Sequence, residues 1–156
     1  MIEVEKTESK SEQYRILTKQ VISMVEGESN ALANMANVCS LVHHSFGHHW
    51  TGFYLVEDNE LVLGPFQGPP ACTRIANGKG VCGTAWSSGQ TQIVANVHEF
   101  EGHIACSPES NSEIVVPLRN SSGKIWGVFD IDSTEFDFFD DTDQQALESI
   151  LSLLQT

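Results

Sequence analysis

The chain has 156 residues, of which 40% are hydrophobic and 19% are charged, and its formal net charge is −13. A chain of this length buries ~70% of its unfolded surface as one domain, so a stabilising disulfide or metal is not required. Eight acids and no base lie between Asp130 and Glu148, and nucleic acids and anionic membranes repel such a protein. We find neither an apolar run of the ~18 residues that span a membrane nor a signal peptide, so we expect a soluble cytoplasmic protein.

Two amphipathic helices are predicted in the first third of the chain. A capping-box pattern at Ser9 and Glu12 precedes apolar residues at three- and four-residue spacing, and Gly27 ends this pattern. The second helix begins near Ser29 and ends at Gly47. The first helix is expected to bury Tyr14, Leu17, Val21 and Met24, and the second Leu32, Met35, Ala36, Cys39 and Val42.

Short β-rich segments and irregular segments alternate through the rest of the chain. Helices at both ends around hairpin-joined strands indicate an α+β fold, with a central antiparallel sheet flanked by N- and C-terminal helices. We expect one domain over 1–156, with residues 1–12 as a flexible N-terminus. In chain order, the expected elements are a hairpin of residues 50–56 and 60–64, a long loop over 64–80, a helix over 81–88 closed by Gly89, strands over 92–97, 112–118 and 124–132, and a helix from about Thr142.

The four cysteines are too far apart in sequence to form the paired ligands of a zinc ribbon. Cys39 belongs to the apolar face of the second helix and is expected to be a core residue. Cys72 and Cys106 lie in long irregular segments, which often carry function. Cys82 opens the short helix, whose N-terminus would lower the pKa of a thiol. For Cys82, reactivity and burial in the core both remain open.

Three acids form a second candidate cluster. Glu113 begins one predicted strand, and Asp130 and Asp132 end another. Because side chains alternate along a strand, both Asp side chains lie on one face. A solvated acidic edge is the alternative, but it fits these two residues poorly because they continue an apolar run without a turn residue.

Histidines between His43 and His49 offer a third candidate. His44 and His48 have the i, i+4 spacing of helical metal ligands. Gly47 ends the helix between them and no carboxylate is near in sequence, so we expect no metal site. His103 is either a base for the Cys106 thiol or a surface-loop histidine.

These residues lie in segments that resemble the free methionine-(R)-sulfoxide reductases, single-domain members of the GAF superfamily. The resemblance covers the chain after the first helix, and its cysteines lie in the strings PACTRI, GVCGTAW and HIAC, which generic GAF sensors lack. It implies a GAF-like antiparallel sheet, often in a homodimer. It also implies reduction of free L-methionine (R)-sulfoxide without a metal or organic cofactor, with thioredoxin as the reductant.

The resemblance also implies roles for individual residues. Cys106 is then the nucleophile, Cys72 its resolving partner and Cys82 an auxiliary thiol. Trp50 would lie against the substrate methyl group with Tyr54 beside it. The substrate pocket would be lined by Glu113, Asp130 and Asp132. The chain departs from the family pattern at Asn96, Glu101 and Ser107, which puts in doubt a role for position 96 in holding the substrate ammonium.

The chemistry of sulfoxide reduction agrees with these residue types. A thiolate attacks the sulfur while the departing oxygen takes up protons, so a thiol and an acid must converge. Cys106 and Glu113 supply both, and a second thiol converts the resulting sulfenic acid to a disulfide. One alternative is a GAF-type sensor that binds a small molecule without turnover. Another is a redox sensor, which would need the cysteines but not the three acids.

Overall fold

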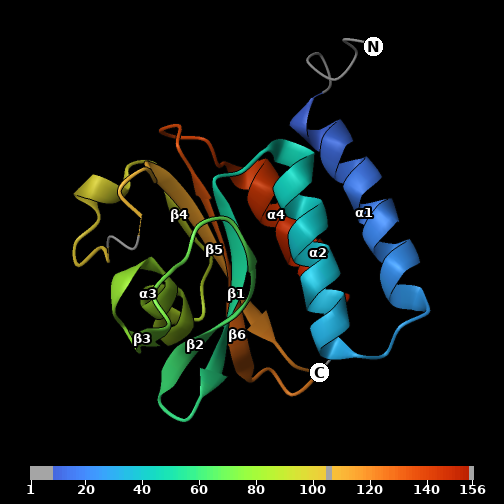
Figure 1. Ribbon diagram of the computed structural model, residues 1–156, viewed down its shortest axis with the longest axis horizontal. Helices are drawn as coiled ribbons and strands as arrows, with labels where there is room; N and C mark the ends of the chain where they lie inside the picture. Colours follow the sequence, from blue (N-terminus) through green and yellow to red (C-terminus); the bar gives the residue numbers. More distant parts are fainter. Residues whose placement is uncertain (1–8, 105–106, 155–156) are drawn as a thin grey trace.

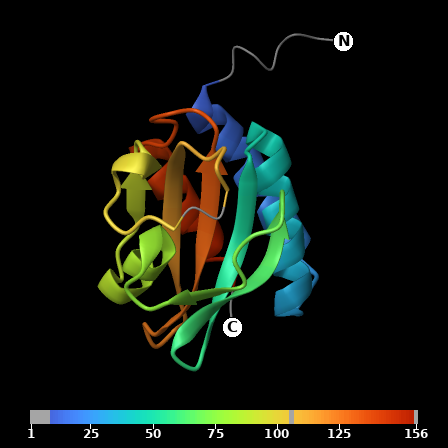
Figure 2. The ribbon, with the colours of Figure 1, turned by 60° about the vertical axis from the view of Figure 1, so that its left-hand side comes forward.

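The computed structural model describes residues 9–104 and 107–154. Its centre is a six-stranded antiparallel sheet in the order β3-β2-β1-β6-β5-β4 (Figures 1 and 2). This confirms the predicted α+β class. The elements are α1 (Lys10–Glu26), α2 (Ala31–Phe46), β1 (Trp50–Glu57), β2 (Glu60–Gln67), β3 (Arg74–Ala76), α3 (Gly80–Ser88), β4 (Gln92–Val94), the 3-10 helix η2 (Val97–Glu99), β5 (Ser112–Arg119), β6 (Ile125–Ser133) and α4 (Asp141–Leu151).

Helices α1, α2 and α4 cover one face of the sheet, and α3 lies on the other (Figure 1). The main core lies between the three helices and the sheet. Along β5 and β6, residues that point into this core alternate with residues that point towards α3. Phe129 and Ile131 of β6 join the main core. The intervening Asp130 faces the opposite side, where a second core lies under α3.

Helix α1 is joined to α4 by a buried polar contact. The Tyr14 hydroxyl donates to Asp143 Oδ1 at 2.6 Å, and Lys10 Nζ donates to Asp143 Oδ2 at 2.7 Å. Asp143 also accepts from the backbone of Asp140, so it completes a capping box at the start of α4. Lys10 belongs to the first turn of α1. Residues 10–12 of the N-terminal segment predicted to be flexible are thus helical, whereas residues 1–8 lie outside the described part of the chain.

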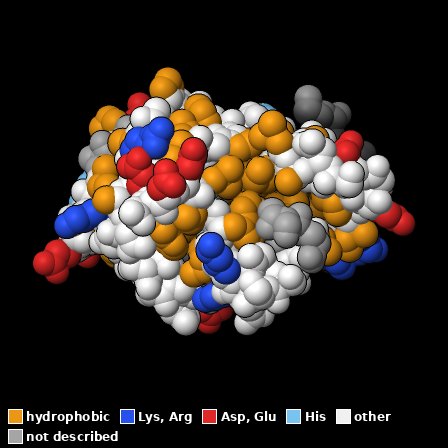
Figure 3. All heavy atoms as spheres, turned by 90° about the horizontal axis from the view of Figure 1, so that it is seen from below, with side chains coloured by type: hydrophobic (Ala, Val, Ile, Leu, Met, Phe, Trp, Pro, Cys, Tyr) orange, Lys and Arg blue, Asp and Glu red, His pale blue; other side chains and the backbone are white. Residues whose placement is uncertain are grey.

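The predicted elements differ from the observed ones mainly at their boundaries. The loop expected over 64–80 contains the end of β2 and all of β3, while the strand expected over 92–97 is confined to β4. In α2, Leu32 and Ala36 are exposed and Val38 is buried. Met35, Cys39 and Val42 are buried as predicted, so the buried stripe shares three residues with the predicted one and is shifted towards Val38. Figure 3 shows one face of the molecule, on which apolar side chains are exposed between scattered charged ones.

No helix in the described part of the chain combines the length and the apolar character that crossing a membrane requires.

Candidate functional site

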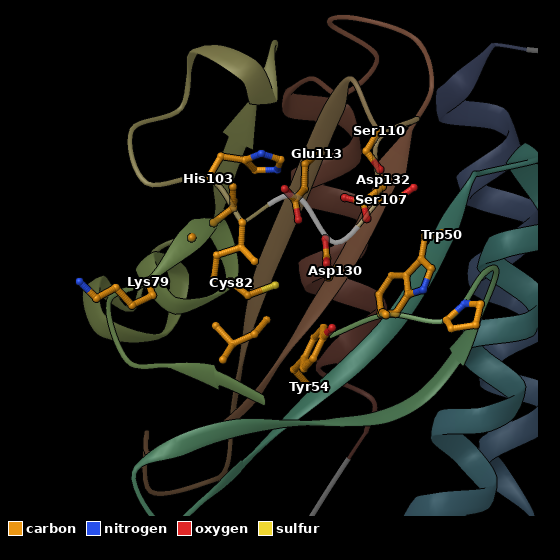
Figure 4. Close-up of a pocket in the computed structure, with 16 residues that line it drawn as sticks. Trp50, Tyr54, Lys79, Cys82, His103, Ser107, Ser110, Glu113, Asp130 and Asp132 are labelled. Carbon is orange, nitrogen blue, oxygen red and sulfur yellow. The ribbon is translucent and has the colours of Figure 1, made fainter. Parts of the chain in front are cut away.

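A cavity opens between α3 and the sheet, on the face opposite α1, α2 and α4 (Figure 4). The space inside it, together with the solvent at its mouth, is about 560 Å³. The structure brings together most of the residues predicted to form a site. Trp50, Tyr54, Cys82, Glu113, Asp130 and Asp132 all line this cavity.

Strand register explains why the three acids meet. Asp132 on β6 is opposite Trp50 on β1 and opposite Glu113 on β5. Asp130 lies two residues earlier on β6, so its side chain emerges on the same face. The carboxyl groups of all three point into the same space in Figure 4. The predicted placement of both Asp side chains on one face is confirmed, and pairing of β5 with β6 adds Glu113.

Trp50 and Tyr54 form an aromatic wall on the β1 side of the cavity. Their ring centroids are 5.9 Å apart and their planes are inclined by 25°. Each ring is fixed by a hydrogen bond to a loop carbonyl: Trp50 Nε1 donates to Pro69 at 3.0 Å, and the Tyr54 hydroxyl donates to Cys72 at 2.8 Å. The wall is therefore rigidly oriented and ties the loop after β2 to the sheet.

Gly52 leaves the space that the Trp50 ring occupies. A Cβ atom at position 52 would lie 2.5 Å from Cη2 of Trp50 and 2.6 Å from Cβ of Phe66. Real Cβ atoms do not approach other heavy atoms so closely, so a side chain at this position would displace the indole.

Burial dominates the electrostatics of the acid cluster. It raises the pKa of Glu113 well above its ordinary value, and the neighbouring charges of Asp130 and Asp132 raise it further. Burial also raises the pKa of Asp132 well above its usual range. The pKa of Asp130 is raised by burial as well, although hydrogen bonding from Glu113 and Cys82 partly offsets the rise. The cluster therefore retains protons at a pH at which ordinary carboxyl groups have lost them.

The acid cluster has no cationic partner within the described ranges. No Lys, Arg or His side chain there forms an ion pair with Glu113, Asp130 or Asp132. Lys79 lines the cavity, but in Figure 4 its amine points away from the three carboxyl groups. A ligand with an ammonium group would supply the missing positive charge.

Cys82 is a buried free thiol beside the acids. Its pKa is raised well above the usual value, first by burial and then by the charges of Asp130 and Glu113. This direction is opposite to the lowering expected for a thiol at a helix N-terminus. Of the two alternatives left open for Cys82, the structure supports burial in the second core.

The other cysteines have different surroundings. Cys39 is buried in the main core, as predicted, where burial raises its pKa to about 12. Cys72 is disulfide-bonded in this structure. Cys106, the predicted nucleophile, lies outside the described residues. Its neighbour in sequence, Ser107, lines the cavity and contacts His49 Nε2 through its hydroxyl at 2.9 Å.

The histidines do not form the i, i+4 metal pair considered from the sequence. His48 is buried against Phe46 and two aromatic residues that precede α4, and burial lowers its pKa to about 3. His44 is exposed. His103 lines the cavity and is half-buried, so it is not simply a surface-loop residue.

The three departures from the family pattern fall in different places. Asn96 caps η2 by accepting from the His98 amide, and it is not among the cavity residues. Glu101 is exposed, whereas Ser107 lines the cavity. Sequence reasoning missed Ser110, whose buried hydroxyl lines the cavity and has no hydrogen-bond partner in the described structure. Its place within an irregular segment two residues before β5 was the available signal.

The fold and the cavity define a GAF domain, and the GAF-domain family model matches residues 35–155. GAF domain-containing protein A of Dictyostelium discoideum is 53% identical over 147 residues, which cover 94% of this chain and 92% of the relative. Free methionine-R-sulfoxide reductase of Escherichia coli (strain K12) is 47% identical over 148 residues, which cover 94% of this chain and 89% of the relative.

A solved structure is similarly close. Free methionine-R-sulfoxide reductase of Neisseria meningitidis, in complex with its substrate, superimposes with a TM-score of 0.92 at 46% identity, covering 96% of this chain and 90% of that chain. The chain therefore belongs to the free methionine-R-sulfoxide reductase family of GAF-domain proteins. This confirms the resemblance drawn from the cysteine-containing strings.

Proposed function

We propose that this protein reduces free L-methionine (R)-sulfoxide to L-methionine. The observation that carries the proposal is a small-molecule cavity with an aromatic wall on one side and a buried, proton-retaining acid cluster on the other. Family membership supports the same substrate, since the relatives from Escherichia coli and Neisseria meningitidis carry the name free methionine-R-sulfoxide reductase.

The substrate groups match the two sides of the cavity. Trp50 and Tyr54 offer an apolar surface for the methyl group on sulfur. The acid cluster lacks a cation, and the substrate ammonium supplies one. Glu113 and Asp132 are the acids with the most strongly raised pKa values, so they are the natural donors of protons to the sulfoxide oxygen.

The reaction then proceeds in two steps. The Cys106 thiolate attacks the sulfoxide sulfur while an acid of the cluster protonates the sulfoxide oxygen. The oxygen then passes to the Cys106 sulfur as its bond to the substrate sulfur breaks, so methionine leaves and Cys106 becomes a sulfenic acid. The Cys72 thiol then displaces the sulfenic oxygen, which leaves as water, and a disulfide forms. The disulfide state of Cys72 in this structure is consistent with this resolving role. Reduction of the disulfide by thioredoxin completes the cycle in a cytoplasm that keeps thiols reduced. Cys82 serves as an auxiliary thiol.

One assay tests the proposal directly. Methionine formation is measured from the separated R and S sulfoxides, both free and within a peptide, with thioredoxin and its reductase supplied. Only the free R form should be reduced, because a peptide leaves the groups that pair with the substrate ammonium and carboxylate unmatched. Comparable rates on the peptide would refute the enclosed site. Binding of the free R form without turnover would instead favour a sensor.

Three variants separate the roles within this scheme. Cys106→Ser should abolish turnover. Cys72→Ser should release about one methionine per subunit and then stall, and peptide mapping should find a disulfide between Cys72 and Cys106 in the oxidised wild type. Glu113→Gln should lower turnover roughly 10²–10⁴-fold, the usual effect of losing a general acid. A dominant disulfide between Cys82 and Cys106 would reverse the assignment of the resolving thiol.

The family resemblance also suggests a homodimer. Sedimentation of the full chain over a range of concentrations tests this part of the proposal independently of activity.

A further inference from the structure

The floor of the cavity places a thiol and two carboxyl groups around one point. The Sγ atom of Cys82 and one oxygen each from Glu113 and Asp130 lie within 4.8 Å of one another. The three residues come from α3, β5 and β6, and all three are buried. Ligands held on separate packed elements are fixed in position more precisely than ligands on one loop.

Asp130 also has an unused ligand atom. Its Oδ1 is buried and has no hydrogen-bond partner within the described structure, although the side chain lines the cavity. A buried carboxylate oxygen without a partner is costly. A cation that entered the cavity would supply that partner, which no Lys, Arg or His of the described ranges supplies by an ion pair.

We propose that Cys82, Glu113 and Asp130 bind a thiophilic divalent cation, of which Zn²⁺ is the best match, and that the ion excludes substrate from the cavity. The exclusion of substrate rests on the proposed function, whereas the metal site does not. The ion is an inhibitor of the site and not a cofactor of the reaction.

The donor set determines which cation fits. A thiolate with two carboxylates favours Zn²⁺ over Mg²⁺ or Ca²⁺, which prefer oxygen ligands alone. Tetrahedral zinc with Zn–S of ~2.3 Å and Zn–O of ~2.0–2.2 Å needs ligand atoms roughly 3.5 Å apart. The three atoms already lie within 4.8 Å, so small side-chain rotations suffice. Three protein ligands leave a fourth position for water, as in open zinc sites.

The ion and the substrate compete because they use the same groups. Glu113 is one of the two carboxyl groups that we assign to proton donation, and Asp130 belongs to the acid cluster that we assign to the substrate ammonium. A bound cation neutralises Asp130 and removes the acid function of Glu113. Metal binding and substrate binding are therefore mutually exclusive.

Titration with Co²⁺ tests the metal site without any turnover. The non-reduced full chain is used, in which Cys72 is disulfide-bonded and the free thiols of the described structure are Cys39 and Cys82. We expect a sulfur-to-cobalt charge-transfer band that Zn²⁺ abolishes by displacement. Cys82→Ser should remove the band. Cys39→Ser is the matched control, because that thiol lies in the main core, and it should leave the band unchanged.

Further variants test the carboxyl ligands. Glu113→Gln and Asp130→Asn should each weaken Co²⁺ binding at least about tenfold. Substitution of residues that only hydrogen-bond to metal ligands already lowers metal affinity or activity 10–100-fold. Glu57→Gln removes an exposed acid at the end of β1 and should leave Co²⁺ binding unchanged. Absence of the band, or a band that survives Cys82→Ser but not Cys39→Ser, overturns the metal site.

Addition of free L-methionine (R)-sulfoxide then tests the competition. The substrate should displace Co²⁺ and reduce the band in proportion to its occupancy. A band that saturating substrate leaves intact refutes mutual exclusion. Metal binding in a protein that reduces no sulfoxide would leave the site standing and refute the proposed function, so the two failures are distinguishable.

Discussion

Replacement of Glu113 by glutamine is expected to stabilise the folded protein at neutral pH while it lowers activity. Glu113 is buried beside Asp130 and Asp132 with no cation at the described positions, and its pKa is raised well above its ordinary value by that burial and those charges. Glutamine has nearly the same shape and carries no charge. Its amide can also donate to the Oδ1 atom of Asp130, which lacks a partner.

The sign of the pH dependence follows from the raised pKa of Glu113. Below the pKa of an unfolded Glu, ~4.3, the side chain is protonated in both states and wild type and Glu113→Gln should have similar stability. As the pH rises above that value, the unfolded wild type releases its proton while the folded form retains it, so wild type loses stability relative to the variant. The advantage of the variant should reach about 1–3 kcal/mol at pH 7–8, the usual scale for a poorly satisfied buried polar group.

Urea unfolding of both proteins between pH 4 and pH 8 measures this difference. A gain of 1 kcal/mol corresponds to roughly 2–4 °C in Tm for a chain of this size. Glu57→Gln serves as the control for net charge because Glu57 is exposed. A Glu113→Gln variant that is less stable than wild type at pH 8, or whose advantage does not grow with pH, would refute the account of the acid cluster.

Three further substitutions test other parts of the structure. Gly52→Ala should lower kcat/KM by about 10²-fold, because the new Cβ would lie 2.5 Å from Trp50 and displace the ring; steady-state kinetics and tryptophan fluorescence would show both effects, and unchanged kinetics would exclude a role for the ring position. Tyr14→Phe removes a 2.6 Å hydrogen bond to buried Asp143 and should cost about 1.5–3 kcal/mol in urea unfolding, whereas no loss would mean that water replaces the hydroxyl. His48 has its pKa lowered by burial to about 3, so the unfolded state binds its proton first and stability falls as the pH drops from ~6.5 towards 3. His48→Phe should reduce this loss relative to wild type, and an identical pH dependence would show that other groups cause it.

Local patterns in the sequence predicted most of the fold. Alternation in β6 correctly placed Asp130 and Asp132 on one face, and Gly89 correctly closed α3. The partial failures arose where tertiary packing decides. Leu32 fits an apolar helical stripe, yet it is 62% exposed because the sheet contacts the side of α2 that carries Val38. Periodicity alone does not specify which of two adjacent stripes meets the sheet.

The site was only partly predictable for the same reason. Sequence alternation aligned two acids, but the approach of Glu113 depends on the register between β5 and β6, which joins residues far apart in the chain. The sequence could not decide between reactivity and burial for Cys82, because the helix dipole is a local property, whereas burial and the acid neighbours come from other strands. Long-range pairing therefore determines the chemistry of the cavity more than any single motif does.

The acid cluster bears directly on the choice between a reductase and a redox sensor. A sensor that only forms a reversible disulfide needs thiols, and the three cavity acids, of which Glu113 and Asp130 are buried, would then destabilise the fold without any function. The GAF fold does not require them, since the corresponding positions on β5 and β6 would accept apolar side chains that extend the second core. Acids placed where they oppose folding are expected at sites that hold and transfer protons. If Glu113→Gln gains stability and loses turnover together, the cluster is explained by sulfoxide reduction; if it gains stability and keeps turnover, the protons come from elsewhere.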